Sequence, residues 1–185
     1  MSRPSVKLPL AQGARMRAPT GRRSIRLSDY DYSSAGAYFV TTCTHNRKPV
    51  FASKRLAHVV WQAWNWLPSR FPGVTLDEFV IMPDHVHFVV WLGDPADRRG
   101  SHPAAQRLKT RPPTLGNVVG AFKTVAARSI NASRGTRGRS VWQRNYYEHV
   151  VRHEAELARI REYIQDNPKQ EHMHQSGDTS AAWSP

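Results

Sequence analysis

The chain has 185 residues, 39% of them hydrophobic, which is enough for one domain with a real core. Its 27 lysines and arginines outnumber its 14 acidic residues and give a formal net charge of +13. This excess predicts a polyanionic partner, nucleic acid before an anionic membrane surface. Cys43 is the single cysteine, which excludes an internal disulfide and a thiolate metal cluster, and no stretch approaches the roughly 20 apolar residues of a membrane span. We expect a cytoplasmic protein.

Three kinds of segment have compositions typical of loops or unstructured chain. Residues 1–28 contain seven lysines and arginines, no acidic residue and no sustained apolar period, so we expect a disordered basic arm. Residues 93–113 and 133–140 are basic and contain glycine or proline, which predicts loops. The polar residues 169–185 predict a flexible tail. The folded domain is therefore expected to span residues 29–168.

The segments between these have the periodicity of strands or helices. In chain order they are a strand at 38–44, a helix at 55–71, strands at 74–82 and 85–92, a helix capped by Thr114 over an apolar stripe at 115–126, an extended segment at 141–151 and a helix at 154–166. Pro83 and Asp84 separate the second and third strands, which predicts a hairpin.

This order predicts an α+β fold, a ferredoxin-like βαββαβ antiparallel sheet with an additional C-terminal helix. A four-stranded sheet of this kind has two faces. We expect one face to carry the helices and the other to be available for chemistry or nucleic acid.

The first candidate site is the histidine pair of the third strand, within IMPDHVHFVVWL. Side chains alternate across a strand, so His85 and His87 are expected to share one face, close enough to bind one metal ion. The alternative is two half-exposed histidines beside a turn. Val86, Phe88, Val90 and Leu92 form an unbroken apolar row on the opposite face, which fixes the register and favours the shared face.

The C-terminal helix offers further candidates in EAELARIREYIQDNP. Its core stripe contains Leu157, Ile160 and Ile164, with Tyr163 at the edge. Tyr163 and Asn167 are four residues apart and lie on one face if the helix continues that far. Each also has an ordinary explanation: Tyr163 as a packing aromatic, and Asn167 as a helix end before Pro168, where the α conformation is disfavoured.

Together these motifs resemble the HUH single-strand transposases, most closely the REP-associated tyrosine transposases of bacteria. The resemblance covers about residues 22–169 and includes RRSIRLSDYDYSSAGAYFVTTCTHNRKPVF, FVIMPDHVHFVVWL, LGNVVGAFKT and VWQRNYYEHVVRHEAELARIREYIQDNP. Several separated motifs in the family's order are far more specific than the histidine pair alone. The chain departs from the family at His153, where relatives often carry a small polar residue that caps the helix, so we expect a weaker helix start.

The resemblance implies a function and its residues. It implies that His85 and His87 bind a divalent metal ion, with Asn167 completing the site, and that Tyr163 is the single nucleophile. The implied reaction nicks and rejoins single DNA strands through a 5′-phosphotyrosine, on hairpins with a single-stranded flank. Imidazole ligands suit Mn²⁺ at least as well as Mg²⁺. The family includes monomers and domain-swapped homodimers, and we expect a nucleoid-associated protein of the bacterial cytoplasm.

Basic and aromatic residues from the second predicted helix, which begins at 115, to the extended segment at 141–151 are candidates for DNA contacts. They are Lys123, Arg128, Arg134, Arg137, Arg139, Trp142, Arg144 and Tyr146. The cations would contact phosphates and the aromatic rings would stack on unpaired bases. Alternation along the strand predicts that about half of the aromatic residues are core instead. For His149 the sequence leaves both the site and the core open.

Three other functions compete with the transposase. One is a hairpin-binding module without catalysis, and a second is a replication or transfer initiator of the HUH class, although those are generally longer. The third is a structural zinc protein in which His85 and His87 join another histidine, such as His172 or His174. A structural zinc protein should unfold when metal is removed, whereas the enzyme should lose cleavage and keep its fold.

Overall fold

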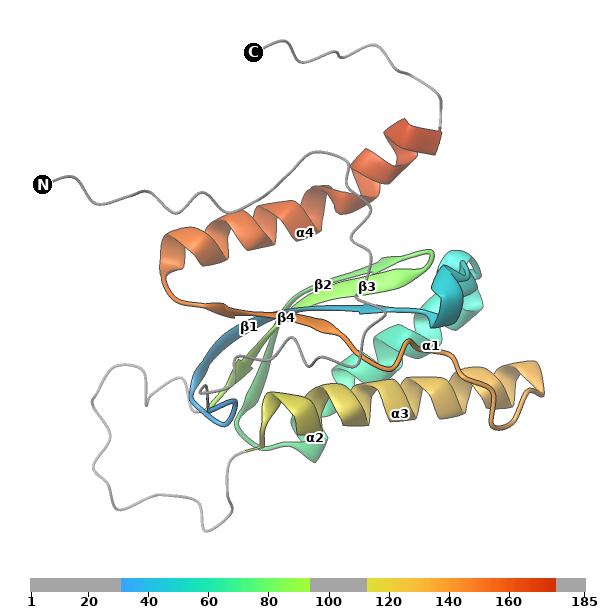
Figure 1. Ribbon diagram of the computed structural model, residues 1–185, viewed down its shortest axis with the longest axis horizontal. Coiled ribbons are helices and arrows are strands. Elements are labelled where there is room, and N and C mark those ends of the chain that lie inside the picture. The colour runs from blue at the N-terminus through green and yellow to red at the C-terminus, as the bar shows by residue number, and fades with distance from the viewer. Residues whose placement is uncertain (1–30, 94–112, 176–185) are drawn as a thin grey trace, which may run out of the picture.

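The computed structural model describes residues 31–93 and 113–175 (Figure 1). The expected basic arm at 1–28, most of the expected loop at 93–113 and the last part of the expected tail lie outside these residues. No helix in the described ranges is both long enough and apolar enough to span a membrane.

Four strands form one antiparallel sheet with the order β2-β3-β1-β4. They are β1 (Gly36–Cys43), β2 (Val74–Met82), β3 (His85–Leu92) and β4 (Tyr147–Val151). The α+β class and the antiparallel four-stranded sheet are confirmed, and β2 and β3 have the predicted bounds. β4 is shorter than the extended segment expected at 141–151, although Trp142 forms an isolated bridge with Thr44. In the segment between Trp142 and β4, carbonyl oxygens of residues 143–145 accept hydrogen bonds from the Lys123 ammonium group.

The helices occupy the predicted regions with changed ends. They are α1 (Lys54–Asn65), α2 (Leu67–Arg70), α3 (Leu115–Arg134) and α4 (Glu154–Gln175), with short 3-10 turns η1 (His45–Arg47) and η2 (Val50–Ala52). The single helix expected at 55–71 is divided, because Pro68 has no N–H to continue the α1 hydrogen-bond ladder. The predicted end of α4 at residue 166 was wrong, since the helix continues through Asn167 and Pro168.

The start of α3 confirms the cap predicted at Thr114. Its side-chain oxygen accepts a hydrogen bond from the Asn117 backbone N–H at 3.2 Å, and the Asn117 side chain accepts one from the Thr114 backbone N–H at 3.1 Å. This reciprocal capping box satisfies two of the unpaired donors at the helix start. The helix ends at Gly135, whose φ of 64° is favourable for glycine.

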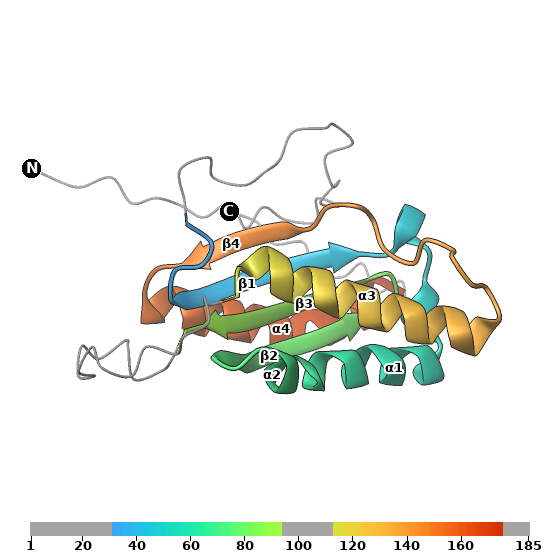
Figure 2. The same ribbon diagram turned by 90° about the horizontal axis from the view of Figure 1, so that it is seen from below.

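Helices lie on both faces of the sheet. α1 and α3 cover one face, side by side in Figure 2, and the main core lies between them and Tyr38, Val40, Phe88 and Val90. α4 crosses the other face in Figure 1 and buries Leu157 and Ile164 against Ala37 and Val89. The sequence led us to expect that the second face would be open for chemistry or nucleic acid. In the structure α4 covers part of it, because the helix buries its apolar stripe there.

Candidate active site

The histidine pair lies at the first residues of β3, directly after the hairpin turn. Both side chains project from the α4 face, while Val86 and Phe88 are fully buried in the main core, which confirms the predicted alternation. The Nε2 atoms of His85 and His87 lie 3.0 Å apart. Two imidazole nitrogens thus converge on one point.

A neighbouring side chain orients each imidazole. Asp84 Oδ1 lies 2.5 Å from His85 Nδ1, and Thr41 Oγ1 lies 2.7 Å from His87 Nδ1. Thr41 can make this contact because it pairs with His87 in the β1–β3 register. Partners on both Nδ1 atoms leave both Nε2 atoms facing each other, as in metal sites whose histidines are held by carboxylates or other polar groups.

The electrostatic environment keeps the inner histidine neutral. Burial, followed by the charge of His85 nearby, lowers the pKa of His87 to about 3. A neutral imidazole can act as a metal ligand at physiological pH. Metal–nitrogen bonds of about 2.1 Å at a right angle would separate two nitrogens by about 3.0 Å. The observed separation fits such a pair, and it equally fits an N–H···N hydrogen bond between the rings.

Tyr163 lies beside the histidines although it is distant in sequence. Its ring centroid is 5.4 Å from that of His87 and 6.2 Å from that of Phe39, edge-on to both. The Ile164 side chain next to it is 1% exposed and packs against the sheet, and Tyr163 lies partly buried at the edge of this apolar contact. The structure therefore brings the expected nucleophile to the expected metal site.

Asn167 lies one helical turn after Tyr163, because α4 does not end before it. Its Nδ2 atom is buried and has no hydrogen-bond partner among the described residues. Within the same part of the chain, no three histidine, cysteine, aspartate or glutamate side chains are placed to bind a metal ion. The Asn167 amide therefore remains the third ligand that the family resemblance implies. The side chains of His172 and His174 lie outside the described side chains.

His149 and His153 fasten the start of α4. His149 Nε2 lies 2.8 Å from Glu156 Oε1, and the Arg152 backbone N–H donates to Glu156 Oε2 at 2.9 Å. The Glu156 backbone N–H donates to His153 Nδ1 at 3.3 Å. His153 therefore caps the helix although it is not a small polar residue, and His149 contacts Glu156 at the same helix start.

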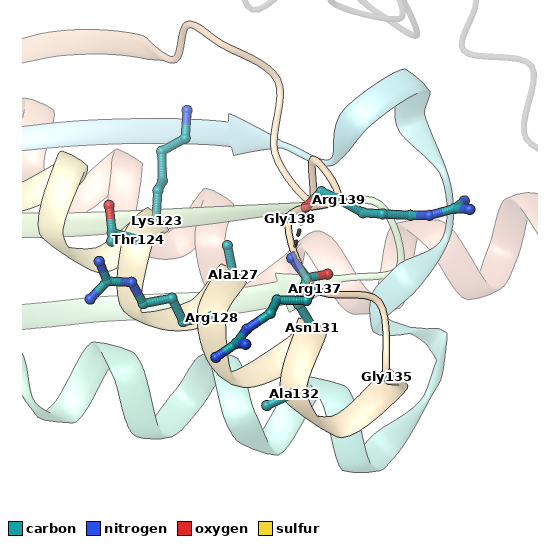
Figure 3. Close-up of a pocket in the computed structure, with 10 residues that line it drawn as sticks. All are labelled: Lys123, Thr124, Ala127, Arg128, Asn131, Ala132, Gly135, Arg137, Gly138 and Arg139. Carbon is teal, nitrogen blue, oxygen red and sulfur yellow. Dashed lines mark hydrogen bonds between the residues drawn. The ribbon is translucent and has the colours of Figure 1, made fainter.

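Several predicted DNA-binding cations line a pocket of about 800 Å³ between α3 and the loop that follows it (Figure 3). Arg128 and Arg137 extend toward the same side of this pocket, and Arg139 points the other way. Asn131 holds the loop, because its Nδ2 donates to the Arg139 carbonyl at 2.8 Å and its Oδ1 accepts from the Thr136 hydroxyl at 3.0 Å. Arg134 and Arg144 are exposed.

Lys123 has a structural contact that the sequence did not predict. Its Nζ donates hydrogen bonds to the carbonyl oxygens of residues 143, 144 and 145, at 2.7, 3.3 and 3.4 Å. Burial lowers its pKa to about 8. The ammonium group thus holds the segment that leads into β4.

Of the aromatic candidates, Trp142 belongs to the core. It is 7% exposed, packs against Phe51 and Phe122, and donates from Nε1 to the Lys123 carbonyl, so no base can stack on it in this conformation. Tyr146 packs against the main core. Tyr147, which the sequence offered with Trp142 and Tyr146 for base stacking, is 38% exposed and lies edge-on to Phe39 on the histidine face. Tyr147 pairs with Thr41, which pairs with His87 on its other side. This strand register, which the sequence does not give, places the Tyr147 ring on the histidine face.

No model of a known protein family matches the chain. An uncharacterized protein of Haemophilus influenzae is 38% identical over 160 residues, which cover 80% of this chain and 88% of that protein. A second protein of that organism, named "Putative REP-associated tyrosine transposase", is 25% identical over 148 residues, 77% of this chain and 76% of its own.

A solved structure gives an independent comparison of the fold. It is a REP-associated tyrosine transposase bound to a REP hairpin, with a TM-score of 0.52 and 18% identity, and the match covers 78% of this chain and 74% of that chain. At this identity the likeness concerns the fold. The chain is thus a distant homologue of the protein named as a REP-associated tyrosine transposase, and it shares its fold with the solved one.

Proposed function

We propose that this protein is a metal-dependent transesterase that nicks and rejoins single-stranded DNA at hairpin-forming repeats, with Tyr163 as its nucleophile. The observation that carries the proposal is the juxtaposition of the converging Nε2 atoms, 3.0 Å apart, with the Tyr163 ring, 5.4 Å from that of His87. The four-stranded sheet then acts as a ferredoxin-like scaffold. It supplies the histidines from β3 and receives the nucleophile from α4.

His85, His87 and the Asn167 amide are the groups that would bind a divalent ion. The ion would polarise a non-bridging oxygen of the target phosphate and reduce the charge that repels the nucleophile. Asp84 and Thr41 keep the two rings oriented for this purpose. Mn²⁺ and Mg²⁺ are the expected ions, since two imidazoles and oxygen ligands suit Mn²⁺ and phosphate chemistry suits Mg²⁺.

Tyr163 carries the covalent step. Its hydroxyl oxygen, on losing its proton, forms a bond to the target phosphorus while the bond from phosphorus to the 3′ oxygen breaks. The leaving 3′ oxygen takes up a proton and becomes a free hydroxyl, and the downstream strand remains attached through its 5′ phosphate. Attack by a 3′ hydroxyl reverses the step and restores the tyrosine. The phosphodiester bond energy is retained, so joining requires no nucleotide cofactor.

The substrate class follows from the charge distribution and from the relatives. Arg128, Arg137 and Arg139 line the pocket beside α3, and Arg134 and Arg144 are exposed nearby in the chain. Guanidinium groups arranged in this way suit DNA phosphates. The solved transposase of similar fold binds a REP hairpin. We extend this substrate to the present chain, with exposed Tyr147 as a surface for stacking an unpaired base.

The test is covalent trapping on a pool of hairpin oligonucleotides with randomised single-stranded flanks, labelled at their 3′ ends. With Mn²⁺ or Mg²⁺, the wild-type protein should become labelled, and peptide mapping should place the adduct on Tyr163. Tyr163→Phe should retain its fold and hairpin binding but form no adduct, while Tyr147→Phe serves as the matched control and should still form it. An adduct on another tyrosine would overturn the assignment.

Metal removal distinguishes the enzyme from a structural zinc protein. The main core under the histidines consists of packed apolar side chains such as Val86 and Phe88, so folding should not depend on a metal ion. Chelation should therefore abolish adduct formation and leave the circular dichroism spectrum and melting temperature nearly unchanged. Unfolding on chelation would favour structural zinc, and hairpin binding without any adduct under all metal conditions would favour a non-catalytic binding module.

A further inference from the structure

The strand next to the histidine strand contains an irregularity that faces α4. Leu76 of β2 pairs with Val90, whereas Phe79 pairs with Phe88, so Asp77 and Glu78 together lie opposite Val89. One extra residue on one strand is a β-bulge. It allows Leu76 and Phe79, three residues apart, both to pack against the main core.

α4 binds both acidic residues of this bulge. Arg161 donates from Nε to Asp77 Oδ1 at 2.9 Å and from Nη2 to Asp77 Oδ2 at 2.7 Å, a bidentate pair. Trp91 Nε1 also donates to Asp77 Oδ2 at 2.7 Å, and Gln165 Nε2 donates to Glu78 Oε1 at 2.8 Å. The Asp77 side chain is only 10% exposed. The Asp77 carboxylate therefore accepts three hydrogen bonds from other side chains, two from Arg161 and one from Trp91.

These contacts flank Tyr163 on the same helix. Arg161 lies two residues before it and Gln165 two residues after it. The apolar contacts of Leu157 and Ile164 hold α4 on the sheet but are non-directional, so by themselves they permit small rotations and shifts of the helix. A bidentate guanidinium–carboxylate pair has a defined geometry and restricts both movements.

We propose that Asp77 and Arg161 are positioning residues that hold Tyr163 in register with the histidine pair. The proposal rests on the function proposed for Tyr163. The bulge gives β2 a carboxylate at the height of Arg161, and the pair determines where the tyrosine hydroxyl lies relative to His85 and His87. Its role is in geometry more than in overall stability, because a displacement of about 1 Å can slow a reaction about 100-fold.

The test uses Arg161→Gln, Asp77→Asn and the double variant, with Arg159→Gln as the matched control. Arg159 is exposed on the same helix and loses the same charge. The measurements are the single-turnover rate of Tyr163 adduct formation at saturating hairpin oligonucleotide, hairpin affinity, and hydrogen exchange of α4. We expect both single variants to slow adduct formation by about 10- to 100-fold, to leave affinity within about twofold of the control, and to speed exchange in α4.

Three comparisons decide the proposal. The double variant should be no slower than the slower single variant, because both substitutions remove one interaction, and Arg161→Lys should restore part of the rate. Additive losses, or rates equal to that of Arg159→Gln, would overturn the positioning role. If wild-type protein forms no Tyr163 adduct, the proposed function fails, and hydrogen exchange still decides whether the pair holds α4: unchanged exchange would refute it.

Discussion

Two isoleucine-to-alanine substitutions should separate the two apolar layers of the fold. Ile164 of α4 is 1% exposed and belongs to the small cluster beneath Tyr163, and Ile130 of α3 is 0% exposed in the main core. The chemical change is the same at both positions. We expect Ile130→Ala to lower the free energy of unfolding of the whole domain, and Ile164→Ala mainly to release α4.

The magnitude follows from what each layer buries. A buried isoleucine truncated to alanine costs about 2–5 kcal/mol, from lost transfer free energy and the cavity left behind. Among the described side chains of α4, the fully buried aliphatic ones are Leu157 and Ile164, and at about 1.5–3 kcal/mol each they contribute about 3–6 kcal/mol to its docking. Removing Ile164 therefore eliminates much of the apolar docking energy of α4. The main core contains many more buried side chains and can lose Ile130 while α4 stays docked.

Native-state hydrogen exchange measured by mass spectrometry should resolve the difference. In Ile164→Ala, amides of α4 should exchange at least tenfold faster while those of β3 and α3 keep nearly wild-type protection. In Ile130→Ala, protection should fall in β3 and α3. Equal loss of protection across all elements in Ile164→Ala would show that α4 and the core unfold as one unit, and the reasoning from separate layers would be refuted.

Three further results are expected. Thr114→Ala should destabilise the domain by about 1 kcal/mol in urea unfolding through loss of the α3 cap, whereas Thr124→Ala, in the middle of the same helix, should change little. Burial by itself would raise the pKa of Asp77, but hydrogen bonds, the largest from Arg161, outweigh it and lower the pKa below its ordinary value. The stability difference between wild type and Arg161→Gln should therefore be full above about pH 4 and shrink as acid protonates Asp77, and a difference that does not shrink as the pH falls below about 4 would contradict this. Removing residues 1–22 should weaken hairpin binding and reduce its salt dependence without moving the cut, whereas a shifted cut would show that the arm reads sequence.

Side-chain periodicity predicted much of the sheet. The alternation in β3 was sufficient to place His85 and His87 on one face and Val86 and Phe88 in the core. The cap at Thr114 was also predictable, because it depends on residues within one helical turn. These features require only local geometry, which the order of residue types specifies directly.

Features that depend on a partner strand were not predicted. The apolar positions of β2 are Val74, Leu76, Phe79 and Ile81, and only the pairing with β3 shows that their break in strict alternation is a β-bulge. Tyr146 and Tyr147 are neighbours on an extended segment and therefore point to opposite faces, but only the pairing of Tyr147 with Thr41 decides which of them lies with the histidines.

The sequence alone thus determined which residues share a face wherever a strand or helix is regular, because the strand repeat of two and the helix repeat of 3.6 residues are properties of the backbone. The tertiary structure decided which faces meet. Burial of Leu157 and Ile164 against Ala37 and Val89 places α4 over the histidine face, and this packing brings Tyr163 to His87. Hydrophobic burial is non-directional, so the pattern of one helix specifies that it must be covered but not by which surface.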